Sequence, residues 1–174
     1  MLHICCGVCA AGVAGRLMAE GHQVMGLFYN PNIYPPDEYH RRLEVAQEVA
    51  RRIDFPLVVP PYRPEEFTAL AEPLKDEPEG GRRCEVCFRL RLEKTFAIIA
   101  GQGCDAFATT LTVSPHKSAL AVNRVGAEIG GERFLQRDFK KQGGFKETMA
   151  LARQWGLYRQ NYCGCVYSLR ERQS

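Results

Sequence analysis

The sequence predicts a single α/β domain, residues 1–174, built on a parallel sheet with flanking helices, and two observations support this. Short apolar segments of strand length alternate with segments of helical periodicity along most of the chain. The connections between the strands are also long enough to bring the chain back in the same direction. The final third departs from this rhythm, so we expect an irregular carboxyl-terminal extension.

The expected strands are short and apolar, at residues 2–5, 23–29, 56–59 and 105–109. The second of them, QVMGLFY, is an almost continuous apolar run, which is typical of a strand covered on both faces. Periodicity and stop signals predict helices at residues 9–19, 37–53, 65–74, 84–100, 117–129 and 145–155. A proline-rich loop follows the second strand, and residues 158–165 are expected to be irregular.

The composition is that of an ordinary globular protein, with 45% hydrophobic and 25% charged residues. No apolar stretch approaches the roughly 20 residues of a membrane span, and the amino terminus lacks the pattern of a signal peptide. We therefore expect a cytoplasmic protein with no membrane partner. Thiols stay reduced in that compartment, which favours metal binding or catalysis over a disulfide framework.

Seven of the eight cysteines fall into three tight groups. A structural zinc site takes four ligands, and an iron-sulfur cluster takes four thiolates, so either one would leave three thiols over. The count predicts a compound metal centre assembled from distant parts of the chain. The groups are Cys5-Cys6-Gly7-Val8-Cys9, Cys84-Glu85-Val86-Cys87 and Cys163-Gly164-Cys165. The eighth cysteine, Cys104, is isolated, and we interpret it as a packing residue.

The predicted fold brings the first cysteine group to one edge of the sheet, together with two loops. Ligands of parallel α/β sheets bind beyond the carboxyl ends of the strands, where the first cysteine group and the loops at 30–34 and 110–116 would meet. The pair Cys84 and Cys87 opens a helix, where the dipole favours thiolate. Plainer interpretations remain open: a redox disulfide for this pair, inert buried thiols for Cys5 and Cys6, and a surface histidine rather than a proton donor or phosphate contact at His116.

Charge is uneven along the chain. The net formal charge is −5 over residues 1–81, +3 over 82–136 and +5 over 137–174. The basic excess accompanies the second and third cysteine groups, and it could attract a polyanion such as nucleic acid. A solvated basic face is the alternative interpretation.

With these features in place, the chain resembles the QueH-type epoxyqueuosine reductases over nearly its whole length. Two departures are that the family commonly has proline in place of Val8, and that the position of Cys9 can hold aspartate, which also ligates iron. The matching stretches are His3-Ile4-Cys5-Cys6-Gly7-Val8-Cys9, Phe28-Tyr29-Asn30-Pro31-Asn32-Ile33, Gly80-Gly81-Arg82-Arg83-Cys84-Glu85-Val86-Cys87-Phe88-Arg89, Thr109-Thr110-Leu111-Thr112-Val113-Ser114-Pro115-His116-Lys117, Arg137-Asp138-Phe139-Lys140-Lys141 and Tyr158-Arg159-Gln160-Asn161-Tyr162-Cys163-Gly164-Cys165.

The resemblance implies a Rossmann-like fold similar to that of the adenine nucleotide alpha hydrolases. It also implies the last step of queuosine biosynthesis in tRNA, in which an epoxide on the modified base is reduced with loss of water. The implied cofactors are a [4Fe-4S] cluster and an adjacent mononuclear iron. The reaction also needs an electron donor as a partner, which the sequence does not identify. Removing the epoxide oxygen needs two electrons and two protons, and an iron with an open position can act on that oxygen as a Lewis acid.

On this basis we expect the cluster to take Cys84 and Cys87 with one thiol from each of the other two groups. Vicinal Cys5 and Cys6 would serve different metals, because successive side chains of extended backbone point to opposite faces. We therefore expect the cluster to be bound by Cys6, Cys84, Cys87 and Cys163, and a catalytic iron to be bound by Cys5, Cys9 and Cys165.

The expected partner is tRNA carrying epoxyqueuosine, in keeping with the basic excess. Tyr29, Tyr34 and Phe139 could stack on an unpaired base, with core packing as the alternative for each. The residues expected to contact phosphate are Arg82, Arg83, Lys117, Lys140, Lys141 and Arg159.

Two other functions fit part of this pattern. A cysteine-dependent tRNA sulfurtransferase would use ATP, but the chain has cysteines where a glycine- and serine-rich phosphate loop is needed. A zinc-stabilised nucleic-acid-binding module without catalysis would explain four thiols and the basic surface.

Overall fold

A four-stranded parallel sheet forms the centre of the molecule, so the predicted α/β class is confirmed. The computed structural model describes residues 1–173. The strands are ordered β3-β2-β1-β4, and Leu2 lies opposite both Gly26 and Ala108. They are β1 (Leu2–His3), β2 (Gly26–Leu27), β3 (Leu57–Val58) and β4 (Ala108–Thr109).

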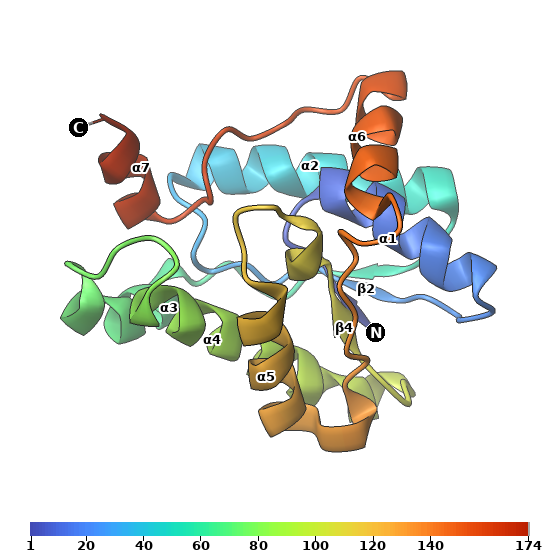
Figure 1. Cartoon of the computed structure of the whole chain (residues 1–174), viewed down its shortest axis with the longest axis horizontal. Helices are drawn as coiled ribbons and strands as arrows, with labels where there is room; N and C mark the ends of the chain where they lie inside the picture. Colours follow the sequence, from blue (N-terminus) through green and yellow to red (C-terminus); the bar gives the residue numbers. More distant parts are fainter. Residues whose placement is uncertain (174) are drawn as a thin grey trace.

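Helices cover both faces of the sheet (Figure 1). One layer contains α1 (Gly7–Ala19), α2 (Pro36–Ile53) and α6 (Gly144–Gln154). The other contains α3 (Pro64–Ala71), α4 (Arg82–Ile99) and α5 (Ala119–Gly130). Short 3-10 turns lie at Glu72–Leu74, Ala100–Gln102, Thr110–Val113 and Gly131–Arg133.

Successive side chains of β2 and its extension enter opposite cores, as the continuous apolar run predicts. Phe28 packs with residues of α1 and α2, whereas its neighbours Leu27 and Tyr29 pack with residues of α4 and α5. All three are at most 3% exposed. The sheet is therefore covered on both faces and is open to ligands only at its edges.

The strands are shorter than predicted, because each leaves the ladder after two residues. At the end of β1 the chain turns into α1, and the Cys5 amide donates to the Thr110 hydroxyl instead of to a neighbouring strand. Residues 158–165 are irregular, as predicted. A helix that the sequence did not predict, α7 (Val166–Gln173), follows them and packs through Tyr167 against Phe67 of α3.

In residues 1–173, no helix combines the length and apolar character needed to cross a membrane.

Candidate metal centre

The first cysteine group lies at the end of β1, the strand on either side of which the chain adds its later strands. From β1 the chain proceeds to β2 and β3 on one side, and β4 then returns to the other side of β1. Such a switch point opens a crevice at the carboxyl ends of the strands. Thr110, directly after β4, accepts a hydrogen bond from the Cys5 amide (3.0 Å) and donates one to Cys5 Sγ (3.3 Å). These bonds hold Cys5 at the crevice.

Three thiols gather at this point. The sulfurs of Cys5, Cys6 and Cys9 all lie within 4.8 Å of one another, close enough to bind one ion. Hydrogen bonds from the Cys6 and Cys9 thiols hold the pKa of Cys5 well below its usual value. The hydrogen bond to Cys5 in turn raises the pKa of Cys6 to about 11. Hydrogen bonds to Cys5 and Cys6 likewise raise the pKa of Cys9 well above its usual value. The group thus favours one thiolate held by two thiols.

The remaining four clustered thiols line a separate small cavity of about 60 Å³. Cys84 and Cys87 come from the first turns of α4, and Cys163 and Cys165 from the loop before α7. Cys84 Sγ accepts a hydrogen bond from the Gly80 amide (3.1 Å).

Three of these four thiols resist ionisation because they are buried. Burial raises the pKa of Cys87 to about 12; the charge of Arg91 opposes this shift, and the nearby cysteines add to it. Burial also raises the pKa of Cys165 to about 11 and that of Cys84 above its usual value. Metal binding removes this penalty because the ligands are bound as thiolates. A set of four sulfurs around a small cavity fits a [4Fe-4S] cluster, and it also fits a single zinc.

Arg42 of α2 fixes the loop that carries Cys163 and Cys165. Its buried guanidinium donates to the carbonyls of Cys163 (3.0 Å) and Tyr162 (3.2 Å), while Glu38 holds its Nε (2.7 Å). Gly164 has a φ of +123°, and a Cβ there would lie 2.8 Å from Arg42 Nη1. The glycine between the two cysteines is thus required by the close approach of this guanidinium.

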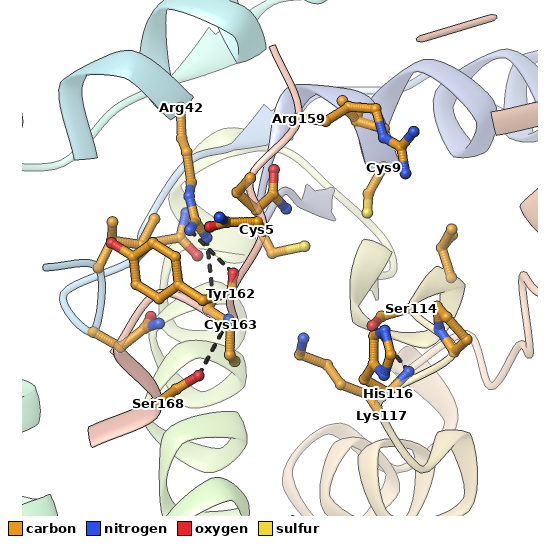
Figure 2. A pocket seen from close by; sticks show the side chains of 18 of the residues that line it. Cys5, Cys9, Arg42, Ser114, His116, Lys117, Arg159, Tyr162, Cys163 and Ser168 are labelled. Atoms are coloured by element: carbon orange, nitrogen blue, oxygen red, sulfur yellow. Dashed lines mark hydrogen bonds between the residues drawn. The ribbon is translucent and has the colours of Figure 1, made fainter. Parts of the chain in front are cut away.

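A larger cavity of about 520 Å³ opens above both thiol groups. Figure 2 shows Cys5, Cys9 and Cys163 around it, with Arg159, His116 and Lys117. Among the described residues that line it, Glu79 is the single carboxylate, against four basic side chains: Arg42, Arg91, Lys117 and Arg159. Burial would lower the pKa of Lys117, but Cys163 and Cys5 outweigh it and raise that pKa. The cavity suits an anionic ligand.

The structure separates the residues expected to contact phosphate into three kinds. Arg82, Lys141 and Arg159 are exposed. Lys117 is partly exposed, and Lys140 is partly buried with its ammonium bound to the carbonyls of Thr112 and Lys117. Arg83 is 1% exposed and ion-paired with Glu171 (2.7 Å). A buried guanidinium cannot reach a phosphate outside the protein, so Arg83 has a structural role instead.

Exposure also distinguishes the aromatic residues expected to stack on a base, and position distinguishes His116 from Cys104. Tyr29 and Phe139 are buried, which agrees with the alternative interpretation that they are core-packing residues, whereas Tyr34 is 46% exposed. His116 is exposed and lines both cavities. Cys104 stands before β4, at the opposite end of the strands from the thiol groups, and it lines neither cavity.

Sequence reasoning missed the polar side chains that support the thiols. The clearest are Arg42, Arg91 and Ser168, which are all at most 2% exposed. Ser168 accepts a hydrogen bond from the Cys163 amide (3.3 Å) and donates one to Glu79 (3.0 Å). Arg91 and Ser168 are near cysteines in the sequence, since Arg91 follows Cys87 by one helical turn and Ser168 follows Cys163 by five residues. Arg42 had no local signal, because the loop that it binds lies far away in the sequence.

Comparison with known proteins identifies the family. A family model described as "Epoxyqueuosine reductase QueH" matches residues 1–171. The chain belongs to the epoxyqueuosine reductase QueH family. Proteins named epoxyqueuosine reductase QueH from Thermotoga maritima and Dehalococcoides mccartyi are 36% and 34% identical to it, over 99% of this chain and 91% and 93% of theirs. One from Streptococcus pyogenes serotype M1 is 35% identical over 98% of this chain and 70% of its own.

The QueH resemblance expected from the motifs is therefore confirmed, and so is the enzyme class, an epoxyqueuosine reductase and thus an oxidoreductase. The match extends across every cysteine group and both cavities.

Proposed function

We propose that this QueH enzyme is an iron-sulfur protein that reduces epoxyqueuosine to queuosine in the anticodon loop of tRNA, the last step of queuosine biosynthesis. The observation that carries the proposal is the convergence of all three cysteine groups on two cavities that share lining residues: Cys5, Cys9 and Cys163 line the larger, basic one, and Cys84, Cys87, Cys163 and Cys165 line the smaller one. We infer a [4Fe-4S] cluster and an adjacent mononuclear iron as cofactors, because the thiols exceed what one centre can use.

The geometry favours a different division of the thiols from the one expected. Cys6 is the N-cap of α1 and Cys9 its third residue, so the start of the helix brings Cys9 back beside Cys6. Cys165 shares the small cavity with Cys84, Cys87 and Cys163. We therefore propose that these four hold the cluster and that Cys5, Cys6 and Cys9 hold the second iron.

When bound, the metal centre would pass on, one at a time, the two electrons that the electron donor supplies, and its second iron would act as a Lewis acid on the epoxide oxygen, which takes up two protons and leaves as water. The chain's own residues bind and orient the substrate. Asn32, Tyr162 and Val113 are among those that shape the larger cavity, and Arg42 keeps Cys163 at its floor. Lys117 Nζ holds a proton beside Cys5 and Cys163, where it would balance negative charge on the substrate oxygen.

The tRNA would be attracted by exposed cations near the cavity. Arg159 lines the cavity and is exposed, and Arg82 is exposed at the start of α4, two residues before Cys84. The backbone carbonyl of Tyr34 accepts a hydrogen bond from the Tyr162 hydroxyl, and the exposed Tyr34 ring would be free to stack on a base. A cytoplasmic location fits this substrate.

Anaerobic purification tests the proposal. We expect a brown protein with about five irons per chain, which converts epoxyqueuosine in tRNA to queuosine when given a chemical reductant. Cys84→Ser should remove about four of the irons, and Cys9→Ala should remove about one while leaving the cluster absorption in place. Cys104→Ser is the matched control, because this thiol lies outside both groups, and it should change neither iron content nor turnover.

Other outcomes would point elsewhere. A colourless protein with stoichiometric zinc and no turnover would support the binding module instead. Unchanged iron content and turnover in Cys9→Ala would contradict the second iron site.

A further inference from the structure

Arg91 lies on the same stripe of α4 as two of the proposed cluster ligands. Cys84, Cys87 and Arg91 are spaced by three and four residues, so their side chains project from one face of the helix. The Arg91 Nε donates to the Cys87 carbonyl (3.0 Å), and its guanidinium lies 5.8 Å from the centre of the Phe88 ring. The helix that provides two thiols therefore directs a fixed cation toward them.

The far end of this side chain has an unused donor. Arg91 is 2% exposed, and its Nη2 is buried without a hydrogen-bond partner in the described structure. A buried charged donor without an acceptor is costly. Its position is therefore best explained by an acceptor that the centre itself supplies.

Arg91 also differs from the other two buried arginines near the thiols. Arg42 is ion-paired with Glu38 and Arg83 with Glu171, whereas within residues 1–171 no carboxylate forms an ion pair with Arg91. Within the described residues, Arg91 is thus left without a carboxylate partner beside two thiol groups, one made of Cys5, Cys6 and Cys9 and the other of the four thiols around the small cavity.

The two cavities place Arg91 between these groups. It lines the small cavity with the four thiols and the large cavity with Cys5 and Cys9. Four thiolates around a [4Fe-4S]²⁺ core carry a net charge of about −2, which becomes more negative with each electron gained. A cation fixed beside that charge stabilises the reduced form more than the oxidised form.

We propose that Arg91 is the positioning residue that sets the reduction potential of the metal centre, by donating its free Nη2 hydrogen to a sulfur of the centre and by supplying a buried positive charge. This inference rests on the proposed function, since it requires the cluster. It assigns to Arg91 an electrostatic role that Arg42 and Arg83, each neutralised by a carboxylate, do not perform.

Redox titration of the anaerobic holoprotein tests this role. We expect the cluster of Arg91→Gln to have a lower midpoint potential than that of the wild type. At the wild-type midpoint potential, the ratio of reduced to oxidised cluster in the variant should fall at least tenfold, which corresponds to a downward shift of about 59 mV for one electron. Arg91→Lys, which keeps the charge, should restore at least half of the shift. The matched control is Arg89→Gln on the exposed side of the same helix, where Arg89 is paired with Glu93 and Glu128, and its midpoint should equal that of the wild type.

The outcomes are separable. A midpoint in Arg91→Gln equal to that of the wild type, with full iron content, would overturn the proposal. If Arg91→Gln lost its iron but kept wild-type helicity by circular dichroism, recovery of iron in Arg91→Lys would support the role of charge, and equal loss in both variants would overturn it. Wild-type protein without iron would instead overturn the proposed cofactors, and this inference with them.

Discussion

At the scale of single residues, His3 joins the strand ends from which the site is built. Its Nε2 lies 3.2 Å from the Tyr29 carbonyl, which can only accept, so Nε2 carries the proton. Its Nδ1 therefore accepts from the Thr109 hydroxyl at 2.9 Å. The Thr109 bond needs the neutral ring, because a protonated Nδ1 cannot accept, and burial, with the charge of Arg91, lowers the pKa of His3 to about 4.

This low pKa predicts a pH-dependent contribution to stability. The unfolded chain binds a proton at a pKa of 6.5 and the folded chain only near 4, so stability is fully present above pH 6.5 and is lost as pH falls toward 4. The loss amounts to roughly 3 kcal/mol. Urea unfolding of metal-free wild type and His3→Gln at pH 7 and pH 4 measures it. The stability of the variant should fall less over this interval, and parallel losses would contradict the assignment.

At the scale of elements, a close approach of two helices fixes the first thiol group. Gly7 begins α1 between Cys6 and Cys9, and a Cβ there would lie 2.6 Å from backbone atoms of Val45 in α2. No side chain can give way at such a contact. The position of α1, and with it the position of three thiols, therefore depends on a residue without a side chain.

A pair of glycine substitutions tests this contact. Gly7→Ala should destabilise the protein by about 1–3 kcal/mol, because α1 and α2 must move apart. It should also lower the iron bound by Cys5, Cys6 and Cys9. Gly15→Ala is the control in the same helix: a Cβ there meets nothing within 4 Å, so higher helix propensity should stabilise the protein by about 0.5–1 kcal/mol. Denaturant unfolding with metal analysis measures both, and equal stability of the two variants would contradict the packing argument.

At the scale of the whole molecule, charge distribution should govern tRNA binding. Removal of a phosphate contact weakens binding and reduces the slope of log affinity against log salt by roughly one. We expect this for Arg82→Ala and Arg159→Ala, whose side chains are exposed on the side of the thiol groups. Arg51→Ala is the control, because Arg51 lies in the last turn of α2, before β3 and at the opposite end of the strands. Filter binding across salt concentrations gives the slopes, and equal slopes in all three variants would exclude these contacts.

Much of the molecule follows from local sequence patterns. The order of strands and helices, the start of a helix near Cys84 and the irregular segment at 158–165 were all predicted, because periodicity and turn residues act over a few neighbours. The place of the first cysteine group beside the loop after β4 followed as well, since the carboxyl ends of parallel strands meet at one edge. The same argument does not place the other two groups, which belong to the start of a helix and to an irregular segment. The helix α7 was missed because it has little apolar periodicity and depends on packing of Tyr167.

The sequence by itself determined the α/β class of this protein and its supply of seven clustered thiols, because composition, spacing and alternation are properties of the chain. Only the tertiary structure decided how those thiols are grouped. The start of α1 turns Cys9 toward Cys6, and Arg42 of α2 fixes Cys163, which lines the small cavity with two thiols of α4. It alone also decided which cations are buried. Arg82 and Arg83 are adjacent in the sequence, yet one is exposed and the other is enclosed, because burial depends on contacts with segments far away along the chain.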